Sequence, residues 1–151
     1  MRLALAAAAL LFAACTTPYA HDAENVGKAT LVPWQFDGIP SPSDVMELGG
    51  LSTTSTTLPF EVGRPLVAEV TILACPMEAE AHCTITERGD TLELAAHFAW
   101  NNVCVTRELH MLSATCVLPA LSERAFLVRF ADKSTTLTVP STGPMISFEI
   151  D

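Results

Sequence analysis

Apolar and polar side chains alternate with a period of two over much of the chain from residue 64 onward. This period is typical of β-strands that bury one face. In Leu66–Ala74, for example, every second side chain from Leu66 onward is apolar and falls on one face. The segments with this pattern, regular or less regular, are Leu66–Ala74 and residues 84–100, 103–109, 116–118, 125–130, 135–139 and 145–150. Several short strands of this kind predict an antiparallel β-sandwich.

Turn and helix signals divide these strands. Residues 84–100 are expected to form a hairpin with Gly89-Asp90 at its corner, since glycine adopts the positive φ of a type II′ turn. Residues 31–36 are apolar enough for a strand, but Pro33 lacks an N–H and restricts it to a sheet edge or a strand start. A short helix is predicted over residues 41–50, capped by Ser41. The hydroxyl-rich residues 51–57 are expected to be a loop.

Residues 116–121 and 125–130 resemble the E–F corner of fibronectin type III and related immunoglobulin-like domains. In that corner a leucine closes one strand and an aromatic residue opens the next. Phe126 stands where a tyrosine is typical, so the hydroxyl bond of a tyrosine corner is missing. The resemblance covers only residues 116–130, and it implies an immunoglobulin-like sandwich among the possible β folds.

The N-terminus carries a different pattern, an apolar run behind a single Arg2. The run is shorter than the roughly 20 residues that span a bilayer, so residues 1–14 are interpreted as a signal peptide. Residues 11–15 resemble a bacterial lipobox, which implies cleavage before Cys15 and a lipid on its sulfur; Phe12 stands where leucine is usual. The alternative is ordinary secretion with cleavage after Ala20, which would place Pro18 where a small residue is preferred. Because Thr16 and not aspartate follows the cysteine, the resemblance also implies sorting to the outer membrane, facing the periplasm or the cell surface.

Cysteine parity agrees with export on either route. The chain has five cysteines, and both lipidation and the alternative cleavage remove Cys15 from pairing. An even number in an oxidising compartment suggests two disulfides, for which three connectivities exist. The local pairs Cys75–Cys83 and Cys104–Cys116 are preferred. The predicted organisation is therefore a signal peptide over residues 1–14, a lipidated tether over 15–28 and a disulfide-containing, all-β, immunoglobulin-like domain over 29–151.

Charge excludes one class of partner. The whole chain has a net charge of −9, and removal of Arg2 leaves seven basic against seventeen acidic side chains. Such a surface repels nucleic-acid backbones and anionic headgroups. We therefore expect no nucleic-acid partner, and membrane attachment through the lipid anchor only.

One segment has candidate metal ligands. Glu78, Glu80 and His82 alternate between Cys75 and Cys83, so an extended loop would point all three to one side. Carboxylates with an imidazole can bind a divalent ion. The alternative is a disulfide-closed loop whose acidic side chains are only solvated. No standard ligand spacing is matched.

Catalytic motifs are absent from the sequence. It has no G-x-S-x-G elbow, no S-x-x-K, no H-E-x-x-H and no glycine-rich phosphate loop. His97 is expected on the outer face of its strand, and His110 in a loop closed by Cys104 and Cys116 that could serve recognition. No catalytic residue and no cofactor is predicted. The expected function is a non-enzymatic envelope lipoprotein that binds another envelope protein or has a structural role. The alternative is a periplasmic small-ligand or metal-ion binding protein that uses the Met77–His82 loop.

Overall fold

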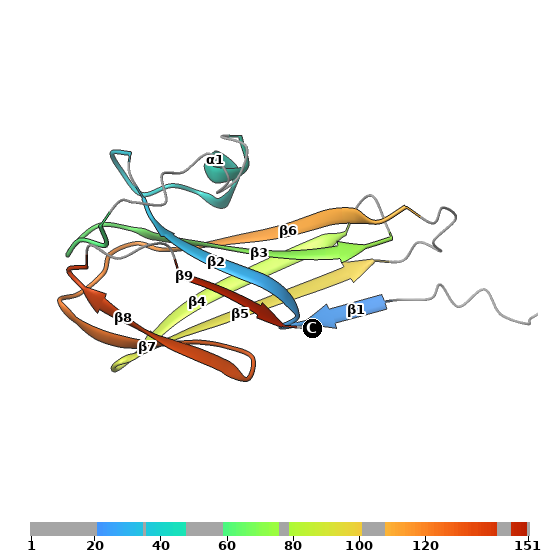
Figure 1. The fold of residues 1–151 in the computed structure, drawn as a ribbon. Helices are drawn as coiled ribbons and strands as arrows, with labels where there is room; N and C mark the ends of the chain where they lie inside the picture. The colour runs from blue at the N-terminus through green and yellow to red at the C-terminus, as the bar shows by residue number, and fades with distance from the viewer. Residues whose placement is uncertain are drawn as a thin grey trace, which may run out of the picture.

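The computed structural model describes residues 21–34, 36–47, 59–75, 79–100, 108–141 and 146–150. Within these residues the chain forms two stacked β-sheets and one short helix, so the predicted all-β sandwich is confirmed (Figure 1). The elements are β1 His21–Glu24, β2 Gly27–Pro33, α1 Pro42–Glu47, β3 Leu66–Ala74, β4 Glu80–Arg88, β5 Thr91–Trp100, β6 His110–Leu118, β7 Arg124–Phe130, β8 Lys133–Val139 and β9 Ile146–Ile150.

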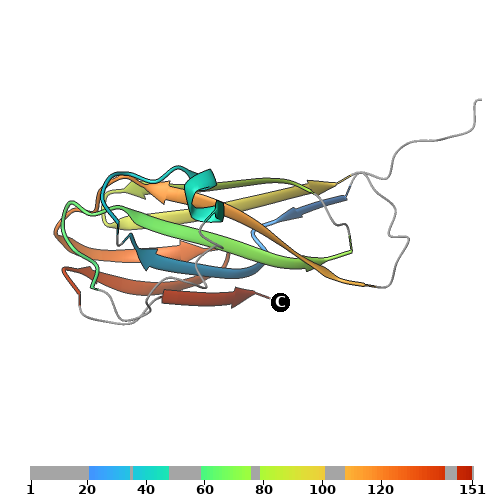
Figure 2. The same ribbon diagram turned by 90° about the horizontal axis from the view of Figure 1, so that it is seen from above.

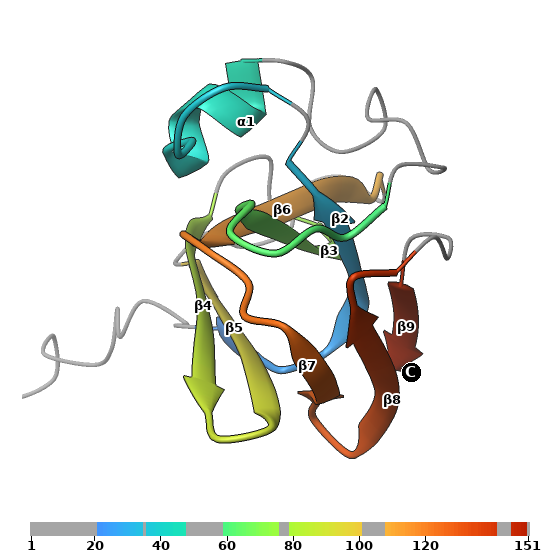
Figure 3. The same cartoon turned by 90° about the vertical axis from the view of Figure 1, so that its left-hand side faces the viewer.

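Among the described strands, four form one sheet in the order β6-β3-β2-β9 and five form the other. In the second sheet β4 pairs with one edge of β5. β1 and β7 pair with opposite ends of the other edge of β5, and β8 pairs with the outer edge of β7. The end-on view shows the two layers, with α1 outside the four-stranded sheet (Figure 3). The N-terminal residues of β2 pair with the last residues of β9.

The apolar side chains of the predicted alternating rows form the core between the two sheets. Every second side chain of β5 from Leu92 to Phe98 is buried, while Phe126, Val128 and Phe130 of β7 are fully buried. In β3 the predicted inner row is buried as well, and Val67 on its outer face is covered by residues next to α1. Burial of these large apolar side chains is the main source of stability in such a domain.

The β4–β5 hairpin turns at Gly89-Asp90 as predicted, and Gly89 has a φ of 59°. Arg124 holds this turn in place, because its guanidinium donates to the Gly89 carbonyl oxygen at 3.1 Å and to Asp90 Oδ1 at 3.3 Å. Thr91, the first residue of β5, pairs with Leu127 of β7, and the two strands run parallel. They are the one parallel pair among the described strands, all the others being antiparallel.

The predicted boundary between tether and domain is wrong. Residues 21–24 pair with β5 as β1, and Gly27 and Lys28 already pair in the four-stranded sheet as part of β2. The chain therefore belongs to the sandwich from His21 and crosses from one sheet to the other at Asn25-Val26. The pattern missed β1 because a four-residue strand is too short to show a period.

Asn25 joins this crossing to β5. Its backbone N–H donates to the Ala96 carbonyl oxygen at 2.9 Å, and its Oδ1 accepts the Ala96 N–H at 3.0 Å. Ala96 lies in the part of β5 between the residues that pair with β1 and those that pair with β7. Asn25 thus provides hydrogen-bond partners for both the N–H and the carbonyl oxygen of Ala96. Asn25 has a φ of 50°, a conformation that asparagine tolerates better than most residues.

Replacement of Asn25 by alanine is expected to cost about 2 kcal/mol, from one lost hydrogen bond and the left-handed backbone. Glycine adopts the positive φ of this position readily, so Asn25→Gly should lower the free energy of unfolding by only about 1 kcal/mol, for the lost hydrogen bond. Asn25→Asp keeps an oxygen that can accept the Ala96 N–H. Urea unfolding and hydrogen exchange at the Ala96 amide measure the two effects. An unchanged exchange rate in Asn25→Ala would contradict this role of the side chain.

β2 corrects the expectation for Pro33. The strand lies inside its sheet, between β3 and β9, and Pro33 is its last residue. Pairing with β9 ends at Leu31, so Pro33 pairs with Leu66 of β3 alone. A proline is compatible with this position because it has a strand neighbour on one side only.

The short helix is confirmed, and it covers part of the outer face of the four-stranded sheet (Figure 2). Ser41 caps it: its Oγ accepts the Asp44 N–H at 3.3 Å, while Asp44 Oδ2 accepts the Ser41 N–H at 2.7 Å. Hydrogen bonds that the Asp44 carboxylate accepts from Ser41 lower the pKa of this carboxyl, most strongly the one from the Ser41 backbone N–H and next the one from its side chain. Val45 packs below the helix against Val32, Trp34 and Val67. The predicted loop 51–57 lies outside the described residues.

The disulfide pairing differs from the preferred one. Cys83 bonds to Cys116, 33 residues away, with the two Cα atoms 5.1 Å apart. Both cysteines belong to strands and not to loops, since Glu80–Arg88 is β4 and His110–Leu118 is β6. Alternation turns each sulfur inward, so the bond joins the edge strands of the two sheets. Cys75 is also disulfide-bonded. Cys104, which was predicted to pair with Cys116, lies outside the described residues.

Candidate functional site

The predicted metal-binding loop ends in a strand, because β4 begins at Glu80. Glu80 and His82 lie on β4 with their side chains on the outer face of the sheet, and Glu78 lies outside the described residues. The Nε2 atom of His82 is 2.8 Å from Oε1 of Glu80, and both side chains are exposed. The structure thus keeps two of the three predicted ligands together, but on a rigid sheet surface.

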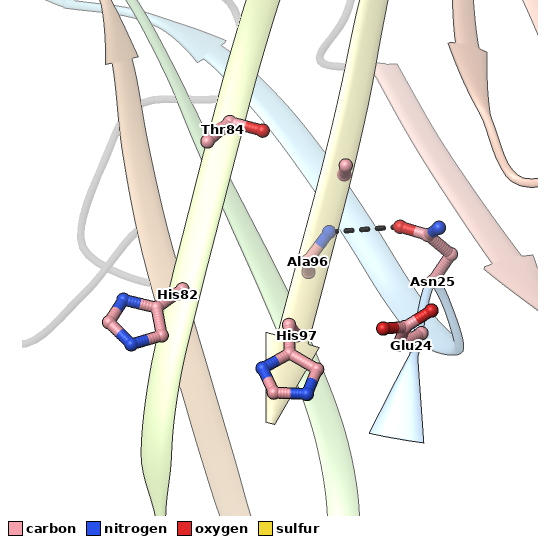
Figure 4. Close-up of a pocket in the computed structure, with 7 residues that line it drawn as sticks. Glu24, Asn25, His82, Thr84, Ala96 and His97 are labelled. Atoms are coloured by element: carbon pink, nitrogen blue, oxygen red, sulfur yellow. Dashed lines mark hydrogen bonds between the residues drawn. The ribbon is translucent and has the colours of Figure 1, made fainter. Parts of the chain in front are cut away.

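A second histidine lies directly opposite the first. His97 of β5 is the register partner of His82, and it points to the same outer face, as predicted for this residue (Figure 4). Its Nε2 atom is 3.4 Å from Oδ1 of Asp22 on β1. Each imidazole therefore has its own carboxylate, one from the same strand and one from the neighbouring strand.

The next strand extends this row of side chains. Glu24 of β1 is the register partner of His97, so Glu24, His97 and His82 lie side by side across three strands. Figure 4 shows the Glu24 carboxylate beside the His97 ring, and the Asn25–Ala96 hydrogen bond that fixes the end of β1. Together they border an open surface depression of about 250 Å³, lined by Glu24, Asn25, His82, Thr84, Ala95, Ala96 and His97.

This depression is the strongest polar candidate in the described part of the chain. Two imidazoles and their carboxylates can bind a cation or exchange protons with solvent. Within the described residues, however, no three histidine, cysteine, aspartate or glutamate side chains converge as a complete metal site. His110 does not join them, because it lies on β6 in the other sheet. The predicted recognition loop around His110 is wrong at this residue, which opens a strand.

A different surface carries exposed apolar side chains. Leu73 of β3 and Met111 of β6 are register partners on the outer face of the four-stranded sheet, and they are 69% and 71% exposed. Leu109, two residues before Met111, is also exposed. Neighbouring apolar side chains left open to water are a feature of interaction surfaces. We call Leu73, Leu109 and Met111 the apolar cluster.

The sequence pattern indicates positions for His82 and His97 separately and does not by itself place them side by side. The signal was present, because a two-residue turn at Gly89-Asp90 sets the register and six residues separate each histidine from it. No local signal pointed to Asp22 or Glu24, since β1 reaches β5 from about 70 residues away in the chain.

Helix α1, with six residues, is too short to cross a membrane, and no other helix in the described residues is long and apolar enough to do so. The predicted lipidation residue, Cys15, lies outside the described residues. No protein-family model, curated protein or solved structure matches this chain.

Proposed function

We propose that the protein is a non-enzymatic lipoprotein of the bacterial envelope that binds another envelope protein. Three features support the proposal: the lipobox-like residues 11–15, a rigid β-sandwich, and an acidic chain with a net charge of −9. The apolar cluster is the observation that carries the binding role. The position proposed is the outer membrane, with the domain in the periplasm or at the cell surface.

The anchor would hold this domain close to the membrane. β1 begins six residues after Cys15, and even a fully extended chain covers at most about 3.6 Å per residue, or roughly 20 Å. The beginning of β1, the end of β3 and the beginning of β6 lie at the same end of the sandwich (Figure 1). A lipidated Cys15 would therefore turn the apolar cluster toward the membrane side, where a membrane-embedded or peripheral protein can reach it.

The likeness to immunoglobulin-like domains is part of this proposal. The crossing from β6 to β7 takes the chain from one sheet to the other, which supports the resemblance of residues 116–130 to an E–F corner. Leu121 and Phe126 are buried on either side of this crossing. Such sandwiches often present binding residues on a rigid frame.

The anchor is tested by native mass spectrometry of protein extracted from membranes in mild detergent. We expect the mass to include diacylglycerol at Cys15 and to lack the four protons lost to two disulfides. Cys15→Ser should leave the membrane fraction and appear in the soluble envelope fraction, with the domain still folded. A Cys15→Ser protein that stays with the membrane would contradict lipid anchoring without affecting the binding role.

The binding role is tested by a photo-crosslinking amino acid placed at Met111 in living cells. We expect one defined adduct that disappears in a Leu73→Asp background. The matched control carries the crosslinker at Leu127, which is also exposed but lies on β7 in the other sheet. Equal adducts from both positions, or an adduct that is insensitive to Leu73→Asp, would count against the apolar cluster as the binding surface.

A further inference from the structure

We propose that His82 and His97 together bind a divalent late transition metal ion, with Cu(II) as the preferred ion. This site goes beyond the proposed protein-binding role and does not rest on it. It also differs from the ligand set predicted from the sequence, because its second imidazole comes from β5 and not from the segment between Cys75 and Cys83.

The strand register provides the geometry. Side chains directly opposite on antiparallel strands have Cβ atoms about 5 Å apart. Imidazole nitrogens bind late transition metals at about 2.0–2.1 Å, so two ligating nitrogens need to be only about 3 Å apart. His82 and His97 are such a directly opposite pair, and both rings lie on the solvent side of the sheet (Figure 4). Metal binding would draw one nitrogen of each ring to this separation by rotation about the side-chain bonds.

The two carboxylates prepare the rings for this role. Glu80 and Asp22 each lie against an Nε2 atom, at 2.8 Å and 3.4 Å respectively. A carboxylate at Nε2 favours a hydrogen on that nitrogen and leaves the lone pair on Nδ1. Histidines that bind metals are commonly oriented in this way by a carboxylate on the other ring nitrogen.

The choice of ion follows from the number of ligands. Two imidazoles are available, and no third protein ligand converges with them among the described residues. Water would complete the coordination. A site with nitrogen and oxygen ligands and no enclosing cage follows the general affinity order, in which Cu(II) exceeds Ni(II) and Zn(II). The acidic surface raises the local concentration of any cation.

The test is a Cu(II) titration of the untagged protein purified from membranes, followed by calorimetry and electron paramagnetic resonance. We expect one equivalent of Cu(II) with a spectrum of two nitrogen ligands, and weaker binding of Zn(II). His82→Asn and His97→Asn should each weaken Cu(II) binding at least tenfold and remove the two-nitrogen signal. Glu80→Gln should weaken it about tenfold, in the range typical of lost orienting carboxylates.

The other two histidines provide matched controls. His21→Asn and His110→Asn should bind Cu(II) as the unmodified protein does. Thermal unfolding without metal shows that each variant is folded before it is titrated. The proposal is overturned if His82→Asn and His97→Asn both bind Cu(II) with unchanged affinity, if only one of them weakens it, or if either control variant removes the site.

Discussion

Replacement of Gly27 by alanine is expected to destabilise the domain by about 4 kcal/mol, from a steric collision and an unfavourable backbone conformation. Gly27 is the first residue of β2, where the chain has just crossed between the sheets, and its φ is 89°. A Cβ atom added there would lie 2.2 Å from the Thr71 carbonyl oxygen and 2.6 Å from Cγ2 of Ile72. Backbone and core side chain would both have to move, which loosens the contact between β2 and β3.

Gly38→Ala is the matched control for this prediction. Gly38 has a nearly equal φ of 84°, but an added Cβ meets no atom within 4 Å. Its replacement should therefore show the backbone cost alone, about 1–2 kcal/mol. Urea unfolding of both variants separates the two contributions. If the two free energies of unfolding fell by the same amount, the collision with β3 would be refuted.

Removal of the bond between β4 and β6, by replacing Cys83 and Cys116 with alanine, is expected to cost about 3–4 kcal/mol. A crosslink restricts the unfolded chain more when it closes a longer loop, and these cysteines are 33 residues apart. The loop between Cys75 and Cys83, predicted from the sequence, would have restricted it less. Because the bond joins edge strands of different sheets, its loss should destabilise the contact between β4 and β6 first.

Peptide mapping without reduction identifies the pairing, and urea unfolding of the double variant measures its contribution. We expect Cys83 and Cys116 in one linked peptide pair. Reduced wild-type protein that keeps the stability of the oxidised protein would contradict a stabilising role, and a Cys75–Cys83 peptide would contradict the pairing itself. Cys15→Ser is the matched control, since it removes a cysteine but neither bonded partner.

Much of the fold was predictable because half-buried strands alternate strictly. The rows of β3 and β5 and the buried aromatics of β7 follow directly from the period of two. The β4–β5 turn was predictable because Gly89 permits the positive φ that a tight corner needs. Ser41 and Pro42 marked the beginning of α1 for equally local reasons.

The candidate site was only partly predictable. Glu80 and His82 were singled out correctly as neighbours, and the position of the turn fixes His97 opposite His82. The segment itself was misinterpreted as a loop because the local Cys75–Cys83 pairing was preferred. That pairing implied a closed loop, whereas the sulfur of Cys83 faces inward from a strand.

The sequence by itself determined the buried rows of β3, β5 and β7, the hairpin register and the helix start, because each depends on residues close together in the chain. It also set the acidic charge and the lipobox-like N-terminus. Only the tertiary structure decided which strands meet: β7 beside β5 in parallel, β1 beside His97, and Cys83 with Cys116. Contacts between distant segments depend on how two whole sheets pack, and a local pattern of apolar residues is compatible with many such packings.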